Sequence, residues 1–121
     1  MKPASSLAVV IMAVSALGRT SAAPSDIWPV AGTQGLVQMV IVPAEHSSDR
    51  GAYEAQILKL CDPERTCFLN FYTNSKGVTP TVPVPDDISN EATATYRRSM
   101  KNGVQIFKWS CRLKLATQDC F

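Results

Sequence analysis

One short polar loop contains the residues of this chain that are best suited to acid–base chemistry. His46 is the single histidine among 121 residues, and histidine is the side chain whose ordinary pKa lies near neutral pH. Ser47, Ser48 and Asp49 follow it directly. Neighbours in sequence rarely reach the geometry of a Ser–His–Asp triad, and the chain has no G-x-S-x-G nucleophile elbow. We therefore predict no catalytic residue, with a small hydrolase-like or metal-assisted enzyme centred on His46 as the alternative.

A second polar group follows a later apolar run. Asn74 and Lys76 come after the run 67–73, whereas His46 comes after the run 36–42. The carboxyl ends of parallel strands meet at one edge of a sheet, and ligands of open α/β sheets gather there. We therefore expect His46, Asn74 and Lys76 to form a ligand-binding edge.

Neither polar group completes a metal site. His46 with Glu45 or Asp49 supplies fewer than the three ordered protein ligands of a catalytic zinc centre. The cysteine spacings, C-x5-C and C-x8-C, are also wider than those of zinc modules. We expect no metal and no cofactor.

A run of basic residues near the C-terminus predicts a second binding surface. No acidic residue lies between Glu91 and Asp119. The basic residues in this interval are Arg97, Arg98, Lys101, Lys108, Arg112 and Lys114. A positive surface attracts acidic partners, so Arg97, Arg98 and Arg112 are candidate ligand-binding residues. The expected partner is an anionic envelope component or an acidic protein.

The first 23 residues predict an export signal. Lys2 gives a positive start, residues 7–17 form an apolar core, and small residues precede position 24, which is the pattern of a cleaved secretory signal. The apolar run is shorter than the roughly 20 residues of a membrane-spanning helix. We therefore expect an exported protein, periplasmic or secreted, that does not span the membrane after cleavage.

Removal of this signal changes the charge of the chain. The formal net charge is +2, but Lys2 and Arg19 belong to the signal. The mature protein then has equal numbers of basic and acidic residues, so its composition does not favour nucleic-acid binding.

The cysteines predict a disulfide framework. All four lie after the signal: Cys61, Cys67, Cys111 and Cys120. An even count in an exported chain favours two disulfides. Residues 62–66 form a natural turn, so we favour Cys61–Cys67 and Cys111–Cys120 among the three possible pairings. By the loop-entropy model, each short loop contributes about 2–3 kcal/mol of stability.

Three apolar segments predict most of the secondary structure. Residues 36–42 and 67–73 resemble strands buried on both faces. Residues 49–60 between them have the apolar spacing of a helix, so the three segments predict a βαβ unit with parallel strands. Residues 86–101 predict a second helix, closed by a Gly-type C-cap at Gly103. Residues 104–113 alternate between apolar and polar and predict a third strand.

These elements predict a single domain over residues 35–121, preceded by an extended lead-in at 24–34. The expected fold is α/β (or α+β): a small two-layer β-α-β-α-β domain with a three-stranded sheet, two helices and two disulfides. The solvated face of the segment 104–113 indicates either an edge strand or a sheet that helices cover on one side only. A further alternative for function is therefore an envelope-complex subunit that pairs through this edge.

Three motifs resemble those of a group of small exported proteins of proteobacteria that carry no assigned activity. The motifs are the run C-F-L-N-F-Y at 67–72, the run W-S-C-R-L at 109–113 and the terminal Cys120-Phe121. The resemblance implies an envelope location and transfers no catalytic residue. Together with the composition, it leads us to expect a non-enzymatic binding or interaction module.

Overall fold

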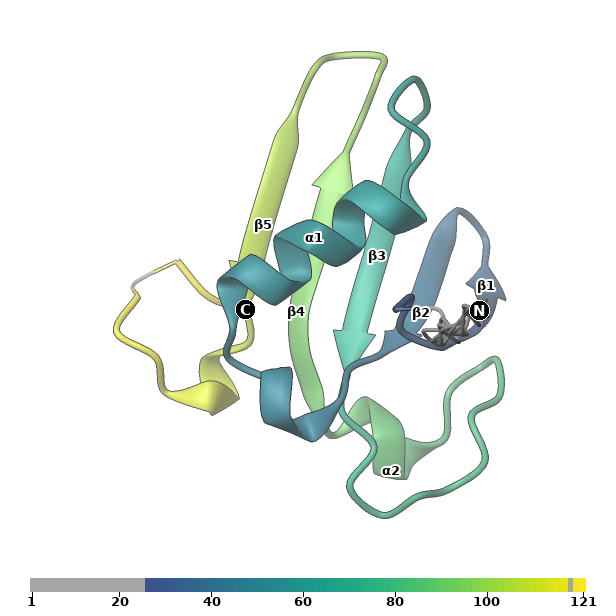
Figure 1. Cartoon of the computed structure of the whole chain (residues 1–121), viewed down its shortest axis with the longest axis vertical. Helices are drawn as coiled ribbons and strands as arrows, with labels where there is room; N and C mark the ends of the chain where they lie inside the picture. The colour runs from purple at the N-terminus through teal and green to yellow at the C-terminus, as the bar shows by residue number, and fades with distance from the viewer. Residues whose placement is uncertain (1–25, 118) are drawn as a thin grey trace, which may run out of the picture.

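A five-stranded mixed sheet forms the centre of the molecule (Figure 1). The computed structural model describes residues 26–117 and 119–121, so the predicted signal peptide at 1–23 lies outside the described residues. The strands follow one another across the sheet in chain order. They are β1 (Val30–Gln34), β2 (Val37–Ile41), β3 (Cys67–Tyr72), β4 (Ala92–Arg98) and β5 (Gln105–Trp109).

The predicted βαβ unit is confirmed in the middle of the sheet. β2 and β3 pair in parallel, and helix α1 (Arg50–Leu60) lies between them in sequence. The Asp49 carboxylate accepts a hydrogen bond from the Ala52 amide at 3.2 Å, which satisfies one of the free amides of the first helical turn. α1 runs across one face of the sheet, in front of β3, β4 and β5 in Figure 1.

The prediction of a three-stranded sheet with two helices is wrong, because residues 86–101 do not form one helix. Only α2 (Asp86–Ser89) is helical, and β4 begins at Ala92 and pairs antiparallel with both β3 and β5. Apolar residues at 92, 94 and 96 fit a strand as well as a helix, and Thr93 and Thr95 favour the strand. Gly103, with φ of 73°, lies in the β4–β5 connection, where Asn-Gly is a common hairpin signal.

The extended lead-in also contains a strand that the sequence analysis missed. β1 pairs antiparallel with β2, and the turn between them contains Gly35 with φ of 65°. The register shifts between Val30 and Gly32, so β1 carries a bulge that interrupts its alternation. The domain therefore includes the lead-in, and its architecture is a small α+β domain.

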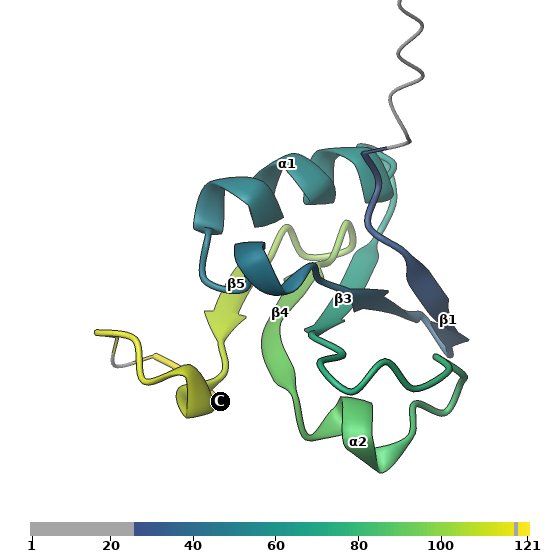
Figure 2. The same cartoon turned by 60° about the horizontal axis from the view of Figure 1, so that its bottom comes forward.

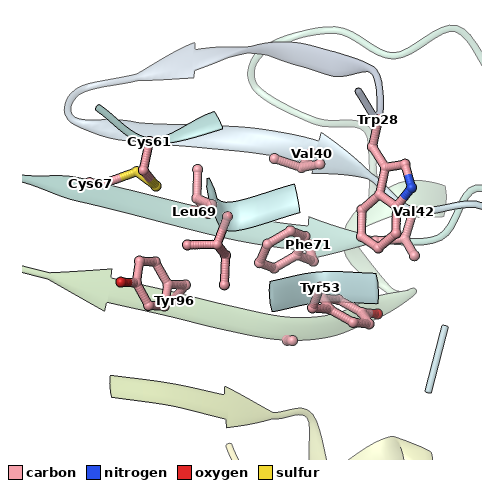
Figure 3. Packing of buried hydrophobic residues seen from close by; sticks show 11 residues of the cluster. Trp28, Val40, Val42, Tyr53, Cys61, Cys67, Leu69, Phe71 and Tyr96 are labelled. Atoms are coloured by element: carbon pink, nitrogen blue, oxygen red, sulfur yellow. A yellow bond between two sulfur atoms is a disulfide. The ribbon is translucent and has the colours of Figure 1, made fainter. Parts of the chain in front are cut away.

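The main core lies between α1 and the sheet (Figure 3). Leu69 and Phe71 of β3 are fully buried, and Tyr53 of α1 meets the Phe71 ring edge-on at a centroid distance of 4.9 Å. Trp28 of the lead-in packs edge-on against both Tyr53 and Phe71. The aromatic rings thus join the lead-in, the helix and the central strand into one unit.

A smaller core lies on the other face of the sheet, beneath the long connection 74–91. Met39, Tyr72 and Ile88 are buried there, and Val82 of the connection packs beside them. Figure 2 shows α1 on one side of the strands and the α2 segment on the other. A Cβ atom added to Gly32 would collide with the Val82 side chain, so only glycine allows the connection to cross β1 this closely.

Two disulfides close the loops that the sequence predicted. Cys61 pairs with Cys67, and Cys111 pairs with Cys120. Disulfides form in oxidising, extracellular-type compartments, so the structure fits that environment. Among the described residues, no helix is long and apolar enough to cross a membrane.

The last residues of the C-terminal tail pair with Trp109, the final residue of β5. Cys120 forms a parallel bridge with Trp109, and the Phe121 amide donates to the Trp109 carbonyl at 3.0 Å. The Ser110 backbone amide instead donates to the Thr93 carbonyl of β4, on the inner side of β5, at 2.8 Å. The disulfide from Cys120 to Cys111 therefore holds the tail against this end of β5.

Candidate functional site

The structure places His46 in the short turn η1 (Ala44–His46), just before α1. Its Nδ1 lies 3.5 Å from a carboxylate oxygen of Asp49, and its ring stacks on Trp28 at a centroid distance of 6.2 Å. An open hollow of about 690 Å³ borders both rings. Because Asp49 also caps α1, the histidine interacts with the group that starts the helix.

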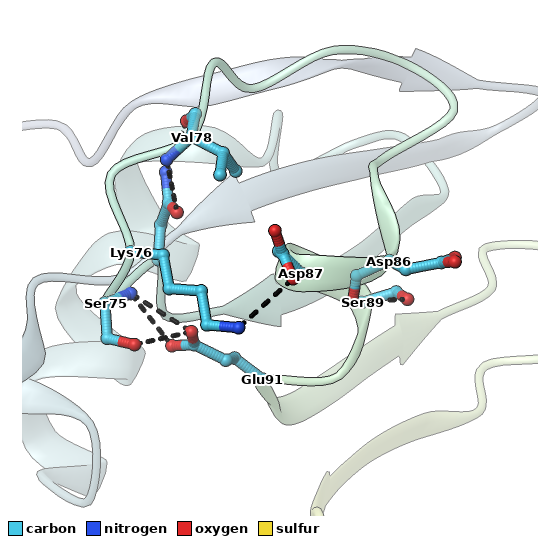
Figure 4. Close-up of polar contacts among 8 residues, drawn as sticks. Ser75, Lys76, Val78, Asp86, Asp87, Ser89 and Glu91 are labelled. Atoms are coloured by element: carbon cyan, nitrogen blue, oxygen red, sulfur yellow. Dashed lines mark hydrogen bonds and ion pairs between the residues drawn. The ribbon is translucent and has the colours of Figure 1, made fainter.

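Asn74 and Lys76 stabilise the connection that follows β3 (Figure 4). The side-chain Nδ2 of Asn74 donates a hydrogen bond to the Val78 carbonyl at 2.8 Å. The side-chain Oδ1 of Asn74 accepts one from the Val78 backbone amide at 3.1 Å. Lys76 lies 3.3 Å from the Asp87 carboxylate. The polar atoms of both side chains are therefore engaged within the loop itself.

Glu91 organises the same connection. Its carboxylate accepts hydrogen bonds from the Ser75 hydroxyl at 2.6 Å, the Ser75 amide at 2.9 Å and the Thr73 hydroxyl at 2.7 Å. Desolvation by burial opposes the ionised form, but these hydrogen bonds and the positive charge of Arg112 outweigh it, so the pKa of Glu91 is lowered. Glu91 is thus a structural carboxylate that stays ionised under mildly acidic conditions.

Two of the three residues assigned to the predicted edge lie in neighbouring hollows, and whether they bind a ligand stays a prediction. Asn74 borders a hollow of about 280 Å³, and this hollow shares Pro29 and Pro43 with the hollow beside His46. Lys76 borders neither hollow. The edge therefore brings His46 and Asn74 into one neighbourhood, whereas Lys76 pairs with Asp87 away from it.

The three candidate arginines do not share one surface. Arg97 and Arg98 are consecutive in β4, so their side chains leave opposite faces of the sheet. Arg112 lies in the turn η2 (Cys111–Leu113), and its Nε donates to the Ala92 carbonyl at 2.7 Å. Because Ala92 is the first residue of β4 and Arg98 the last, these arginines lie near different ends of the strand.

Arg97 belongs to the sheet face opposite α1. Its guanidinium donates to the Asn70 side-chain oxygen at 2.8 Å and lies 5.5 Å from the centre of the Phe68 ring. Burial lowers the pKa of Arg97, with a smaller opposite effect from Tyr72. Arg97 therefore serves as the polar partner of a mid-strand asparagine.

Arg98 lies on the other face, at a groove of about 410 Å³ between α1 and the β4–β5 hairpin. The residues that line this groove come from one helix and two strands. They are Arg50, Glu54, Ile57, Leu58, Tyr96, Arg98, Gln105 and Phe107. Its volume falls within the range of about 300–1,000 Å³ that is usual for small-ligand sites.

Two polar groups of this groove have no hydrogen-bond partner among the described residues. They are the Tyr96 hydroxyl and Nε of Arg98. Tyr96 is only 3% exposed, and Figure 3 shows its hydroxyl directed along β4 toward the end of the strand. An unsatisfied buried polar group costs about 1–3 kcal/mol, so these groups are suited to a ligand that accepts their hydrogen bonds.

The rest of the groove lining combines apolar side chains with a neutralised charge. The Arg50 guanidinium covers the Phe107 ring at 3.9 Å from its centre, and Glu54 pairs with Arg50 at 3.2 Å. Leu58 is 82% exposed. The groove thus combines the polar groups of Tyr96 and Arg98 with an apolar wall formed by Ile57, Leu58 and Phe107.

Comparisons with protein families, curated proteins and solved structures find no match to this chain. The chemistry of the groove and of the His46 edge is therefore the basis for any statement about function.

Arg98 is a candidate binding residue from the sequence alone, but the groove around it is not predictable from the sequence pattern. The predicted helix over residues 86–101 includes both Tyr96 and Arg98, and a helix there does not place the two side chains beside a strand at 105–109. The side chains from Thr93 to Arg98 alternate in character, and this alternation was the signal that could have indicated a strand. A correct strand assignment there places Tyr96 and Arg98 on one face, two residues apart.

Proposed function

We propose that this protein is a non-enzymatic binding domain of the exported compartment, and that its ligand occupies the groove between α1, β4 and β5. The observation that carries the proposal is the pair of unpartnered groups, the Tyr96 hydroxyl and Arg98 Nε, beside an apolar wall. Small-ligand sites characteristically combine an apolar lining with a few converging polar groups.

Binding is favoured over catalysis because the candidate catalytic side chain already has intramolecular contacts. His46 interacts with Asp49 and stacks on Trp28. The described residues that line the groove include no histidine, cysteine or serine. An enzyme centred on His46 is the competing proposal, and the variant His46→Ala separates the two: a groove-binding domain keeps its ligand affinity in this variant, whereas an enzyme loses its activity.

Export is part of this proposal. The two disulfides support an oxidising compartment, and the residues at 1–23 have the pattern of a cleaved signal. The resemblance to small exported proteins of proteobacteria supports the envelope or the medium as the location. Mass spectrometry of protein from the exported fraction tests this by reading the mature N-terminus.

The experiment that tests groove binding is a titration followed by amide resonances in solution. Three eight-carbon probes of different charge are used: octanoate, 1-octanol and octylamine. We expect at least one of them to shift the resonances of Gln105, Phe107 and Leu58 saturably, with the Asn74 loop unaffected. Absence of saturable shifts with all three probes overturns the groove as a ligand site.

A further inference from the structure

We propose that the groove selects an aliphatic monocarboxylate, with the carboxylate held by Tyr96 and Arg98 and the chain lying along Leu58 and Phe107. This inference rests on the proposed function, because it names the chemical class of ligand for the same groove. It follows from the charges, the donors and the apolar surface of the eight lining residues.

The charge of the groove favours an anion. Glu54 neutralises Arg50 through an ion pair at 3.2 Å. Arg98 instead donates through Nη2 to the backbone carbonyls of Asp62 and Arg65. Carbonyl oxygens hold a guanidinium in place without neutralising it, so among the lining residues one positive charge, that of Arg98, has no carboxylate partner.

The donors favour a carboxylate in particular. The Tyr96 hydroxyl and Arg98 Nε both lack partners among the described residues, and both can donate. A carboxylate has two acceptor oxygens and a single negative charge, which matches two donors and one free cation. A phosphate dianion would carry a second charge for which the groove supplies no additional free cation.

The apolar wall favours an aliphatic chain. Ile57 is buried, Leu58 is 82% exposed, and the Arg50 guanidinium lies 3.9 Å from the centre of the Phe107 ring, which is only partly buried. A chain lying there would remove apolar surface from water, which contributes about 25 cal/mol for each Å² buried. The polar atoms of Tyr96 and Arg98 are buried in the unliganded protein. We therefore expect the exposed side chain of Gln105, the cross-strand neighbour of Arg98, to move when the carboxylate enters.

The test compares octanoate with 1-octanol and with acetate, each titrated into the full folded protein at neutral pH. Octanol has the chain without the carboxylate, and acetate has the carboxylate without the chain. We expect octanoate to bind at least about tenfold more tightly than either probe, since a hydrogen bond to a charged group is worth about a factor of ten or more.

The matched variants are Tyr96→Phe and Tyr72→Phe. Tyr72 is also buried, but its hydroxyl lies 3.7 Å from the Met39 sulfur, within the core beneath the connection 74–91. We expect Tyr96→Phe to weaken octanoate binding about tenfold and to leave octanol binding unchanged. Tyr72→Phe should leave both affinities unchanged. Thermal melting of both variants establishes that they are folded.

Four outcomes overturn the inference, and they differ in whether the proposed function survives. Equal affinity for octanol and octanoate rejects the carboxylate and leaves groove binding intact. Tighter binding of octylamine than of octanoate rejects an anionic ligand and also leaves groove binding intact. Absence of saturable shifts with any eight-carbon probe rejects both the inference and the proposed function, as does a response confined to the hollow at His46.

Discussion

Two buried tyrosine hydroxyls on the helix-covered face have opposite surroundings. The Tyr53 hydroxyl lies 2.8 Å from both the Ser47 carbonyl and the Thr93 hydroxyl. The Tyr96 hydroxyl has no partner among the described residues. Removing a satisfied hydroxyl leaves its partners unpaired, whereas removing an unsatisfied one relieves a desolvation cost.

The variants Tyr53→Phe and Tyr96→Phe should therefore change stability in opposite directions. We expect Tyr53→Phe to lower the free energy of unfolding by about 1–3 kcal/mol and Tyr96→Phe to raise it by about 1 kcal/mol. Urea denaturation of the ligand-free protein measures both changes. A loss of stability in Tyr96→Phe comparable to that in Tyr53→Phe would mean that the Tyr96 hydroxyl is already satisfied, and it would count against its availability for a ligand.

The buried Tyr53 also predicts a loss of stability at alkaline pH. Desolvation raises the pKa of Tyr53 from 10.0 to about 12, despite smaller opposite effects of the Thr93 hydrogen bond and of Arg112. In the unfolded chain the hydroxyl ionises near pH 10, so the unfolded state loses its proton first. Stability attributable to Tyr53 is therefore complete below pH 10 and falls as the pH rises toward 12.

Absorbance of tyrosinate measures this effect directly. We expect Tyr53 to titrate later in the folded protein than in the unfolded chain, so the late component of the absorbance change should decrease in Tyr53→Phe. A late component that persists undiminished in Tyr53→Phe would assign the raised pKa to another tyrosine.

At the scale of elements, Gly32 controls how the connection 74–91 packs on β1. Its φ is 155°, and an added Cβ would meet the Val82 side chain. We expect Gly32→Ala to lower the free energy of unfolding by about 2–3 kcal/mol, because backbone strain and overpacking both act there. Chemical denaturation measures the change.

Gly35→Ala is the matched control for that substitution. Gly35 also has a positive φ, of 65°, but no atom lies within 4 Å of the position of an added Cβ. We expect Gly35→Ala to lower the free energy of unfolding by only about 1–2 kcal/mol, which is the strain of the left-handed conformation. Equal losses for the two variants would show that the contact with Val82 contributes nothing.

The sequence predicted helices and strands correctly where the pattern of apolar residues fitted only one type of secondary structure. The apolar runs that became β2 and β3 were short, β-branched or aromatic, and bounded by turn residues, so their pairing around α1 followed. In the segment 86–101, Ile88, Ala92 and Tyr96 recur every four residues and suggest a helix. Ala92, Ala94 and Tyr96 also alternate, and the long-range pairing of β4 with β3 and β5 decided in favour of the strand.

The candidate sites differ in the same way: one could be predicted from the sequence and the other could not. His46 and Asn74 were placed at one edge because parallel strands alone determine that edge. The groove depends on the register between β4 and β5, which sets Tyr96 opposite Phe107 and Arg98 opposite Gln105. Local periodicity contains no information about a cross-strand register, so the groove required the tertiary structure.

At the scale of the whole molecule, the two disulfides stabilise different parts of the fold. The Cys61–Cys67 bridge closes the loop before β3, next to the main core. The Cys111–Cys120 bridge holds only the tail and η2. We expect the double variant Cys61→Ser/Cys67→Ser to lower stability by about 2–3 kcal/mol, and the double variant Cys111→Ser/Cys120→Ser to have a smaller effect on denaturation midpoints.

The C-terminal bridge has a different consequence, which concerns association between molecules. The tail pairs with Trp109 on the outer edge of β5, and the unpaired edge of a sheet is a template for strands from other chains. Release of the tail in Cys111→Ser/Cys120→Ser should therefore raise light scattering at high protein concentration, while Cys61→Ser/Cys67→Ser, examined below its unfolding transition, should not. The last two residues of the chain would then limit sheet growth from one molecule to the next, so that reduction at the C-terminus promotes aggregation without prior unfolding.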